Sequence, residues 1–198
     1  LLTSSPSKEE TGHIDKIAPN SSGTLVTWGK NDRVLKDYQD PGGSHAQKAL
    51  KKTVENFRYH VSMVFQRFLD TDDSRARNIE IFLNGKPAIP WSPFCEEYSD
   101  LVAEDKRPVE FESGKKSEFL IEAYILPRKE EFPTEEAAKK ANVSNELQGI
   151  YIYRENRLIQ AHTWLGMWTK EPHGSLIRVN FSFDHSLDEA FRVDVKKS

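Results

Sequence analysis

The stretch that decides the fold reads Gly149-Ile150-Tyr151-Ile152-Tyr153-Arg154-Glu155-Asn156-Arg157-Leu158-Ile159. Two runs of β-branched and aromatic residues flank the polar pair Glu155-Asn156, a pattern that predicts a β-hairpin. Further along the chain, residues 176–183 alternate, with Ile, Val and Phe on one side and Leu, Arg, Asn and Ser on the other. This period of two predicts a strand. We therefore expect the last third of the chain to be rich in β-structure.

The strongest helical pattern covers residues 45–69. Apolar residues recur there at spacings of three and four, which places them on one helix face: Ala46, Leu50, Val54, Phe57, Val61, Val64 and Phe68. We expect Ser44 to cap this helix and its apolar face to cover a sheet. A second, short helix is predicted from Thr134 to Ala141, with Thr134 as its cap.

Several further strands are predicted between and before these elements. Asn84-Gly85 is a strong hairpin signal between residues 78–83 and 86–89. The other predicted strands cover residues 23–28, 109–112 and 118–126, and residues 184–190 favour a short helix. The residues alone thus indicate an α+β or α/β fold with seven or eight strands and one long helix. Residues 1–22 are interpreted as a flexible tail or linker and residues 23–198 as the folded domain.

Composition excludes several classes of protein. The chain has 198 residues, a net charge of −3 and 30% charged residues, yet it carries 11 Phe, 6 Tyr and 4 Trp, which argues for a packed core. No apolar run approaches the roughly 18 residues that a membrane helix needs, and residues 1–6 do not resemble a signal peptide. The single Cys95 excludes a disulfide framework and favours a reducing, cytoplasmic setting.

Few residues are arranged for catalysis. No His pair has the spacing of a helical metal site, so no metal is expected, and Glu96 and Glu97 should raise the pKa of the Cys95 thiol. Metal-dependent nuclease chemistry stays an alternative, because two segments combine acids with a lysine: Glu104-Asp105-Lys106 and Asp194-Val195-Lys196. The basic residues Arg154, Arg157, Lys196 and Lys197 could contact phosphate or a partner, or lie solvated at the surface.

Five segments, in this order, resemble one protein family. They are Gly23–Arg33, Leu83–Pro87 followed by Trp91–Phe94, Gln148–Ile159, Trp164–Gly166 and Asp194–Ser198. The order resembles the second half of bacterial ATP-binding proteins of the GHKL superfamily, which includes gyrase B, the ninety-kilodalton heat-shock chaperones, histidine kinases and MutL. Within it the sequence is most similar to MORC-like proteins. The stretch from Tyr153 to Ile159 is the most specific piece.

The resemblance implies a transducer domain. Its expected fold is a mixed sheet backed by helices, similar to a domain of a small-subunit ribosomal protein, with a left-handed βαβ crossover. Its expected function is to sense the ATP γ-phosphate bound by an N-terminal domain of the same chain and to couple hydrolysis to conformational change. DNA-directed or defence processes, a homodimer and DNA or DNA-processing partners are further implications of the resemblance.

The family's phosphate-contacting lysine maps onto the segment Asp194–Ser198, with Lys197 as first choice and Lys196 as second. The family's adenine motif and magnesium-binding Asn helix are not in this sequence. We therefore expect ATP and Mg²⁺ in the parent protein, and neither a cofactor nor activity in these 198 residues alone. A non-enzymatic module that binds nucleic acid or protein through Arg154 and Arg157 is the alternative from another class.

Overall fold

The computed structural model describes residues 7–17, 19, 23–26, 36–40, 42–111, 114, 116–188 and 190–191. The chain divides into two compact units, Leu1–Lys52 and Thr53–Ser198. The first unit holds α1 (Lys8–Ile17), which lies within the predicted tail, and the beginning of α2 (Ser44–Val64). Residues 23–26 form no strand, and the remainder of the strand predicted over 23–28 lies outside the described residues.

The second unit contains the other elements. After the end of α2 they follow as α3 (Gln66–Leu69), β1 (Phe82–Leu83), β2 (Lys86–Pro87), β3 (Asp100–Glu110), β4 (Lys116–Ile125), η1 (Lys129–Glu131), α4 (Glu135–Ala141), η2 (Asn145–Leu147), β5 (Gly149–Arg154), β6 (Arg157–Thr163), η3 (Pro172–Gly174), β7 (Ile177–Phe183) and η4 (His185–Leu187).

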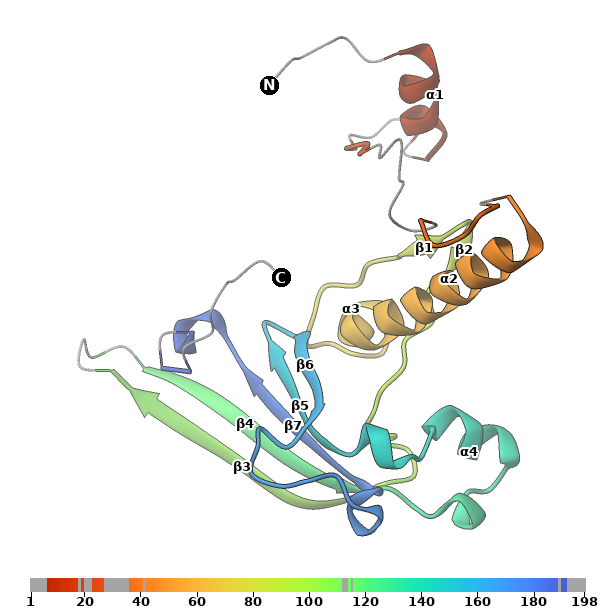
Figure 1. The fold of residues 1–198 in the computed structure, drawn as a ribbon. Helices are drawn as coiled ribbons and strands as arrows, with labels where there is room; N and C mark the ends of the chain where they lie inside the picture. Colours follow the sequence, from red (N-terminus) through yellow and green to blue (C-terminus); the bar gives the residue numbers. More distant parts are fainter. Residues whose placement is uncertain are drawn as a thin grey trace. The chain divides into compact units, whose positions relative to one another are not determined.

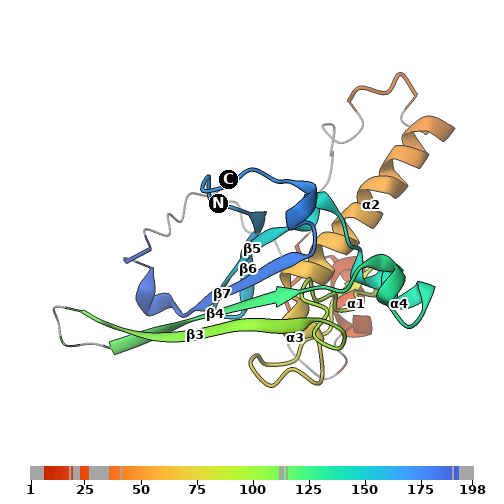
Figure 2. The ribbon, with the colours of Figure 1, turned by 90° about the horizontal axis from the view of Figure 1, so that it is seen from below.

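Five strands form one mixed sheet in the order β3-β4-β7-β5-β6 (Figure 1). The pair β5–β7 is parallel and the other neighbours are antiparallel. Seen from below, the β3–β4 ribbon extends beyond the rest of the sheet (Figure 2), because β7 pairs only with Phe119–Ile125 of β4. The predicted α+β class with a mixed sheet and helices is therefore confirmed.

The connection between the two parallel strands differs from the one that the resemblance implies. The chain passes from β5 to β7 through β6 and η3, so this connection contains no α-helix. The described strands contain no other parallel pair. The expected left-handed βαβ crossover is therefore wrong for this part of the chain, because the connection runs through the edge strand β6, in the plane of the sheet, and not through a helix over its face.

The two predicted hairpins and the short helix are present. Glu155 and Asn156 both have positive φ, as a two-residue turn between twisted strands requires, and Arg154 pairs with Arg157 across it. The Asn84-Gly85 hairpin forms with much shorter strands than predicted. In α4 the Thr134 hydroxyl accepts a hydrogen bond from the Ala137 amide, which is the predicted cap.

The long helix departs from its prediction in two ways. It is divided at Phe65, which separates α2 from α3. Part of its apolar stripe is also uncovered, because Leu50 is 42% and Phe57 53% exposed. Val61 and Val64, at the end of α2, are buried.

The main core lies between the end of α2, the loop at Trp91–Phe94 and one face of the sheet. Its buried members are Met63, Val64, Trp91, Phe94, Leu147, Tyr151, Tyr153 and Leu158. The Trp91 indole nitrogen donates to the Lys140 carbonyl over 2.7 Å, which fastens this loop to α4. The loop at Trp91–Phe94 is thus anchored by its aromatic residues.

The sheet has an unusual distribution of polarity. On β7, the polar residues Arg178 and Asn180 face the core side and are 0% and 1% exposed. Their partners across the ladder on this face are Tyr124 and Glu122 of β4. The opposite face is apolar. Apart from Phe183, which is buried, its apolar residues on β4, β5 and β7 are partly exposed: Phe119, Ile121, Ala123, Ile125, Ile150, Ile152, Ile177, Val179 and Phe181. We call these nine residues the open apolar face.

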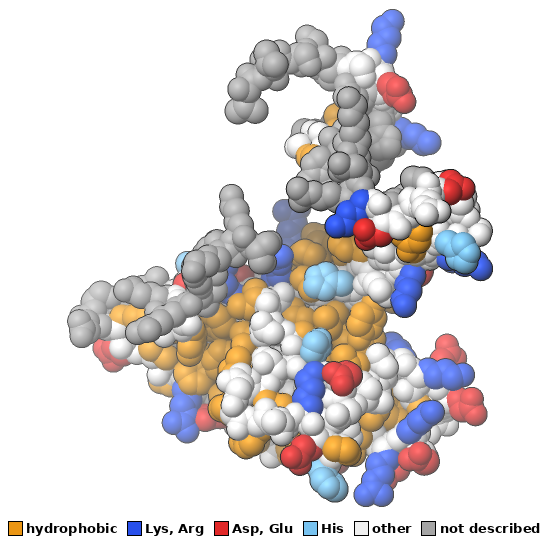
Figure 3. Space-filling model, in the orientation of Figure 1, with side chains coloured by type: hydrophobic (Ala, Val, Ile, Leu, Met, Phe, Trp, Pro, Cys, Tyr) orange, Lys and Arg blue, Asp and Glu red, His pale blue; other side chains and the backbone are white. Residues whose placement is uncertain are grey.

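Figure 3 shows hydrophobic side chains gathered over the strands of the sheet. No helix among the described residues contributes to a buried cluster on this face, since the three buried clusters contain none of its nine residues. Apolar surface of this extent normally contacts another element or another protein.

Candidate functional site

Two of the four basic residues considered for phosphate contact, Arg154 and Arg157, make contacts within the chain. The Arg154 guanidinium forms a bidentate pair with Asp188, with Nε 2.6 Å from Oδ1 and Nη2 2.5 Å from Oδ2. This hydrogen bonding raises the pKa of Arg154 and lowers that of Asp188. The Arg157 guanidinium lies 5.5 Å from the centre of the Phe65 ring. In the described structure both residues therefore fasten the β5–β6 hairpin to its neighbours.

Lys196 and Lys197 lie outside the described residues, as does the segment Asp194–Lys196 of the nuclease alternative. Phe191, the last described residue before them, contacts three other aromatic rings. The Phe191 ring lies 5.0 Å from Phe183, 5.2 Å from Phe181 and 6.0 Å from Phe119, measured between ring centres. Phe191 thus lies at one end of the open apolar face.

The other nuclease candidate lies on an exposed strand. Glu104, Asp105 and Lys106 belong to β3, where Lys106 pairs with Glu118 over 2.6 Å. Within the described part of the chain, no group of three or more His, Cys, Asp or Glu residues is placed to hold a metal ion. These side chains therefore act as solvated edge residues in this structure.

A buried polar network that the sequence did not reveal centres on Arg67 of α3. Its Nη2 donates to Asn180 Oδ1 over 3.0 Å and its Nη1 to Asn156 Oδ1 over 3.2 Å. Asn180 in turn donates to Glu122 over 2.6 Å. Burial lowers the pKa of Arg67 to about 10. Because the nearest partner oxygens are amides, Arg67 is a buried cation held by neutral groups.

Asn156 lies in the segment Tyr153–Ile159, the most specific part of the resemblance, and has a structural role there. Its amide nitrogen donates to the Arg75 carbonyl over 2.7 Å, so the turn of the β5–β6 hairpin joins α3 to the loop after it. Arg75 pairs with Asp73 over 2.6 Å. The sequence indicated only that Asn156 is a polar residue in a predicted two-residue turn. It could not indicate which distant residues Asn156 contacts.

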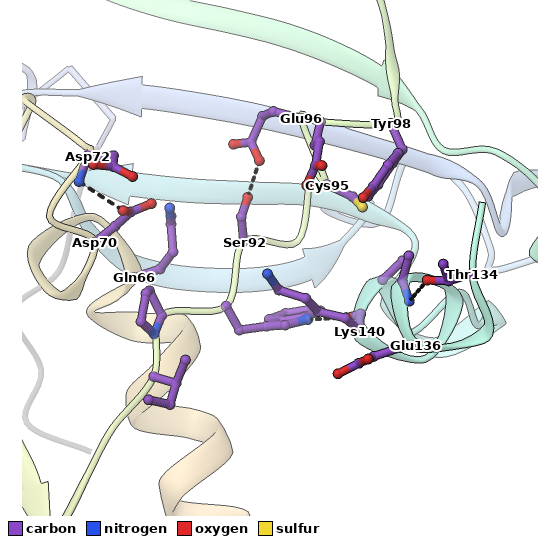
Figure 4. A pocket seen from close by; sticks show the side chains of 16 residues that line it. Gln66, Asp70, Asp72, Ser92, Cys95, Glu96, Tyr98, Thr134, Glu136 and Lys140 are labelled. Atoms are coloured by element: carbon purple, nitrogen blue, oxygen red, sulfur yellow. Dashed lines mark hydrogen bonds between the residues drawn. The ribbon is translucent and has the colours of Figure 1, made fainter. Parts of the chain in front are cut away.

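A sizeable cavity lies beside α3, the Trp91 loop and α4. It has a volume of about 630 Å³ and is lined by both apolar and charged side chains (Figure 4). Ile89, Pro90 and Trp91 form its apolar part. Its charged residues are Asp70, Asp72, Glu96, Glu97, Glu136 and Lys140, so acids outnumber bases by five to one. We call this the acidic cavity; its volume lies within the range of small-molecule sites.

One wall of the acidic cavity carries a polar group without a partner. Gln66 is only 3% exposed, and its side-chain amide makes no hydrogen bond to any described residue. In Figure 4 this amide points into the space between Asp70 and Ser92. Its nitrogen and oxygen are not among the fully enclosed unpartnered atoms of the described residues, so they are open to the cavity and free to pair with a ligand there.

Cys95 lines the same cavity and is not activated. Its burial and the neighbouring Glu96 and Glu97 raise the pKa of its thiol, as the sequence predicted. Glu96 also accepts a hydrogen bond from the Ser92 hydroxyl over 2.7 Å. A nucleophilic cysteine needs a lowered pKa, so the cavity is suited to binding rather than to thiol chemistry.

Comparison with known proteins adds no assignment: no family model matches the chain, and neither do any curated protein or solved structure. Among the described residues, no helix combines the length and the apolar character needed to span a bilayer.

Proposed function

We propose that this chain is the transducer module of a GHKL-type ATPase, in which a lysine of the segment Asp194–Ser198 senses the ATP γ-phosphate and couples hydrolysis to movement of the module. The ATP-binding domain would be supplied by the same protein, with Mg²⁺ held there. The support comes from the five resembling segments and from the geometry around residue 191.

The observation that carries the proposal is the position of Phe191 on the open apolar face. Lys196 and Lys197 follow it by five and six residues, which span at most about 18 and 21 Å of extended chain. A domain that packs on the open apolar face would therefore lie within reach of either lysine. Burial of this face against such a domain would also remove its apolar surface from water.

A lysine suits this role because its ammonium is a compact charge on a flexible stem, which can follow a phosphate that appears and disappears. Sensing requires that the contact exists with ATP and is lost with ADP, since only a difference between the two states can shift a conformational equilibrium. The pair Arg154–Asp188 holds the residue that follows η4 against β5.

The decisive experiment is ATP turnover by the full-length protein that contains this chain. Lys197→Ala should lower kcat at least tenfold, and Lys196→Ala should have the smaller effect. Lys129→Ala, on the exposed η1, is the matched control and should leave turnover unchanged. Equal turnover in all three variants would contradict the proposal.

Two measurements on the 198-residue chain separate the alternatives. Calorimetry with Mg-ATP should give no heat of binding, and micromolar affinity would overturn the idea that a second domain binds the nucleotide. A gel shift that weakens steeply with salt would favour the nucleic-acid module, because phosphate contacts release counterions. Cleavage of plasmid in the presence of Mg²⁺ or Mn²⁺ would favour the nuclease.

A further inference from the structure

We propose that the acidic cavity binds an aliphatic polyamine, a flexible chain of methylene groups carrying two or more ammonium groups. The site is independent of ATP and of the lysine segment. It is formed entirely by residues 66–141, which belong to one compact unit.

Charge is the first reason. Five carboxylates and one ammonium line the cavity, so its formal charge is about −4. A concave site lined by one sign of charge concentrates the field and attracts counterions. Asp70 and Asp72 lie at one end of the cavity and Glu136 at the opposite end, as Figure 4 shows. Separated carboxylates match a ligand whose ammonium groups are themselves separated.

The Gln66 amide is the second reason, and it is independent of the acidic residues. Its carbonyl oxygen can accept a hydrogen bond from an ammonium group, which supplies the partner that this buried side chain lacks. The free oxygens of Asp70 and Asp72 lie on the same side. Asp70 uses one oxygen to accept from the Asp72 amide over 3.1 Å, and its other oxygen makes no hydrogen bond to a described residue.

The apolar part of the cavity is the third reason. Trp91 is held in place by the hydrogen bond to Lys140 and by Tyr59, whose ring centre lies 5.1 Å away. Ile89 and Pro90 continue this apolar surface. Methylene groups can pack against it, and an indole face attracts a nearby ammonium. A bare divalent ion could use none of these contacts, and the described residues contain no cluster fit for a metal.

Calorimetry with spermidine at 150 mM salt tests the proposal. We expect one saturable site, with Asp70→Asn and Gln66→Leu each weakening the affinity roughly tenfold, the size of one hydrogen bond to a charged group. Asn at position 70 keeps the oxygen that accepts from Asp72. Glu135→Gln, at an exposed position of α4, makes the same change in net charge and should leave the affinity within twofold.

A variant that is expected to bind more tightly serves as a control, because misfolding could only weaken binding. Lys140→Gln removes the only ammonium in the cavity and should tighten spermidine binding about threefold, whereas Lys139→Gln next to it should not. The backbone carbonyl of Lys140 still accepts from Trp91 in this variant.

Three results would overturn the proposal. They are the absence of saturable spermidine binding, equal effects of the cavity variants and their controls, and binding of Mg²⁺ that is reduced by the same variants to the same extent. The last result would mean that the carboxylates attract any cation, without recognition of the methylene chain.

Discussion

The guanidinium of Arg67 lies over the ring of Tyr153, with Cζ 3.8 Å from the ring centre. Both side chains are almost completely buried. The contact joins α3 to β5, and the two hydrogen bonds from Arg67 to Asn156 and Asn180 extend it to the hairpin turn and to β7. A single cation thus connects one helix to three places in the sheet, and the residues around it allow direct tests of the structure.

Tyr151 and Tyr153 form a matched pair on one strand. The Tyr151 hydroxyl donates to the Leu147 carbonyl over 2.6 Å, whereas the buried Tyr153 hydroxyl has no partner among the described residues. Tyr151→Phe should therefore lower the free energy of unfolding by about 1–2 kcal/mol, and Tyr153→Phe should change it by less than about 0.5 kcal/mol. Urea denaturation measures both, and an equal loss in the two variants would contradict the structure.

Replacing Arg67 by lysine should destabilise the protein more than replacing it by methionine. Arg67→Lys keeps a buried charge, loses the planar group that bonds two amides, and should cost about 3 kcal/mol. Arg67→Met keeps the stem over Tyr153 without a charge and should cost about 1 kcal/mol. The test is urea denaturation of both variants, with a check that the dependence of unfolding free energy on urea concentration is unchanged. A larger cost for Arg67→Met than for Arg67→Lys would show that Arg67 is not a desolvated cation.

Because the polar side of β7 faces the core, substitutions on its polar side should cost more stability than substitutions on its apolar side. Asn180→Val, which adds apolar volume to a core-facing position, should cost about 2–4 kcal/mol, because Glu122 and Arg67 each lose a buried partner. Val179→Thr, on the open apolar face, should cost less than about 1 kcal/mol. A larger cost for Val179→Thr than for Asn180→Val would mean that the apolar face is the true core.

Acid should weaken the attachment of η4. The bidentate bond from Arg154 holds the pKa of Asp188 below its ordinary value. The stability that this provides is therefore complete above that ordinary value, near pH 4, and is lost as the pH falls through the lowered pKa. In Asp188→Asn, the decline in unfolding free energy below about pH 4 should be shallower than in the unchanged protein.

Arg154→Gln tests the same pair from its other side and should give the same shallower decline, since Asp188 would lose the group that lowers its pKa. The contribution at neutral pH should stay below about 1 kcal/mol, because both side chains are partly in contact with water. Unchanged pH dependence in both variants would show that the pair does not form in solution.

Local patterns in the sequence predicted the elements that depend on neighbouring residues. The Glu155-Asn156 turn needs only residues tolerant of positive φ between two β-forming runs, and the start of α4 needs only the Thr134 hydroxyl beside a free amide. The first nine residues of β3 were missed, because Asp, Glu and Lys are uncommon in strands. Their charge suits an edge strand, where it discourages pairing with other molecules.

The acidic cavity could not be predicted, because its walls come from segments that are distant in sequence. Gln66, Asp70 and Asp72 follow the helix break, Glu96 follows the Trp91 loop, and Lys140 belongs to α4. None of these residues, considered by itself in the sequence, indicates a cavity. The tertiary structure brings them to one cavity, where the Trp91 indole donates to the Lys140 carbonyl and the unpaired Gln66 amide points inward.

The sequence by itself determined that residues 177–183 form a strand with one apolar and one polar side, because side chains alternate across any strand. It could not determine which side faces the core. That depended on Arg67 and Glu122, which pair with the Asn180 amide of β7 and so allow this polar residue to be buried. The apolar side is consequently left at the surface, and tertiary contacts alone decided this.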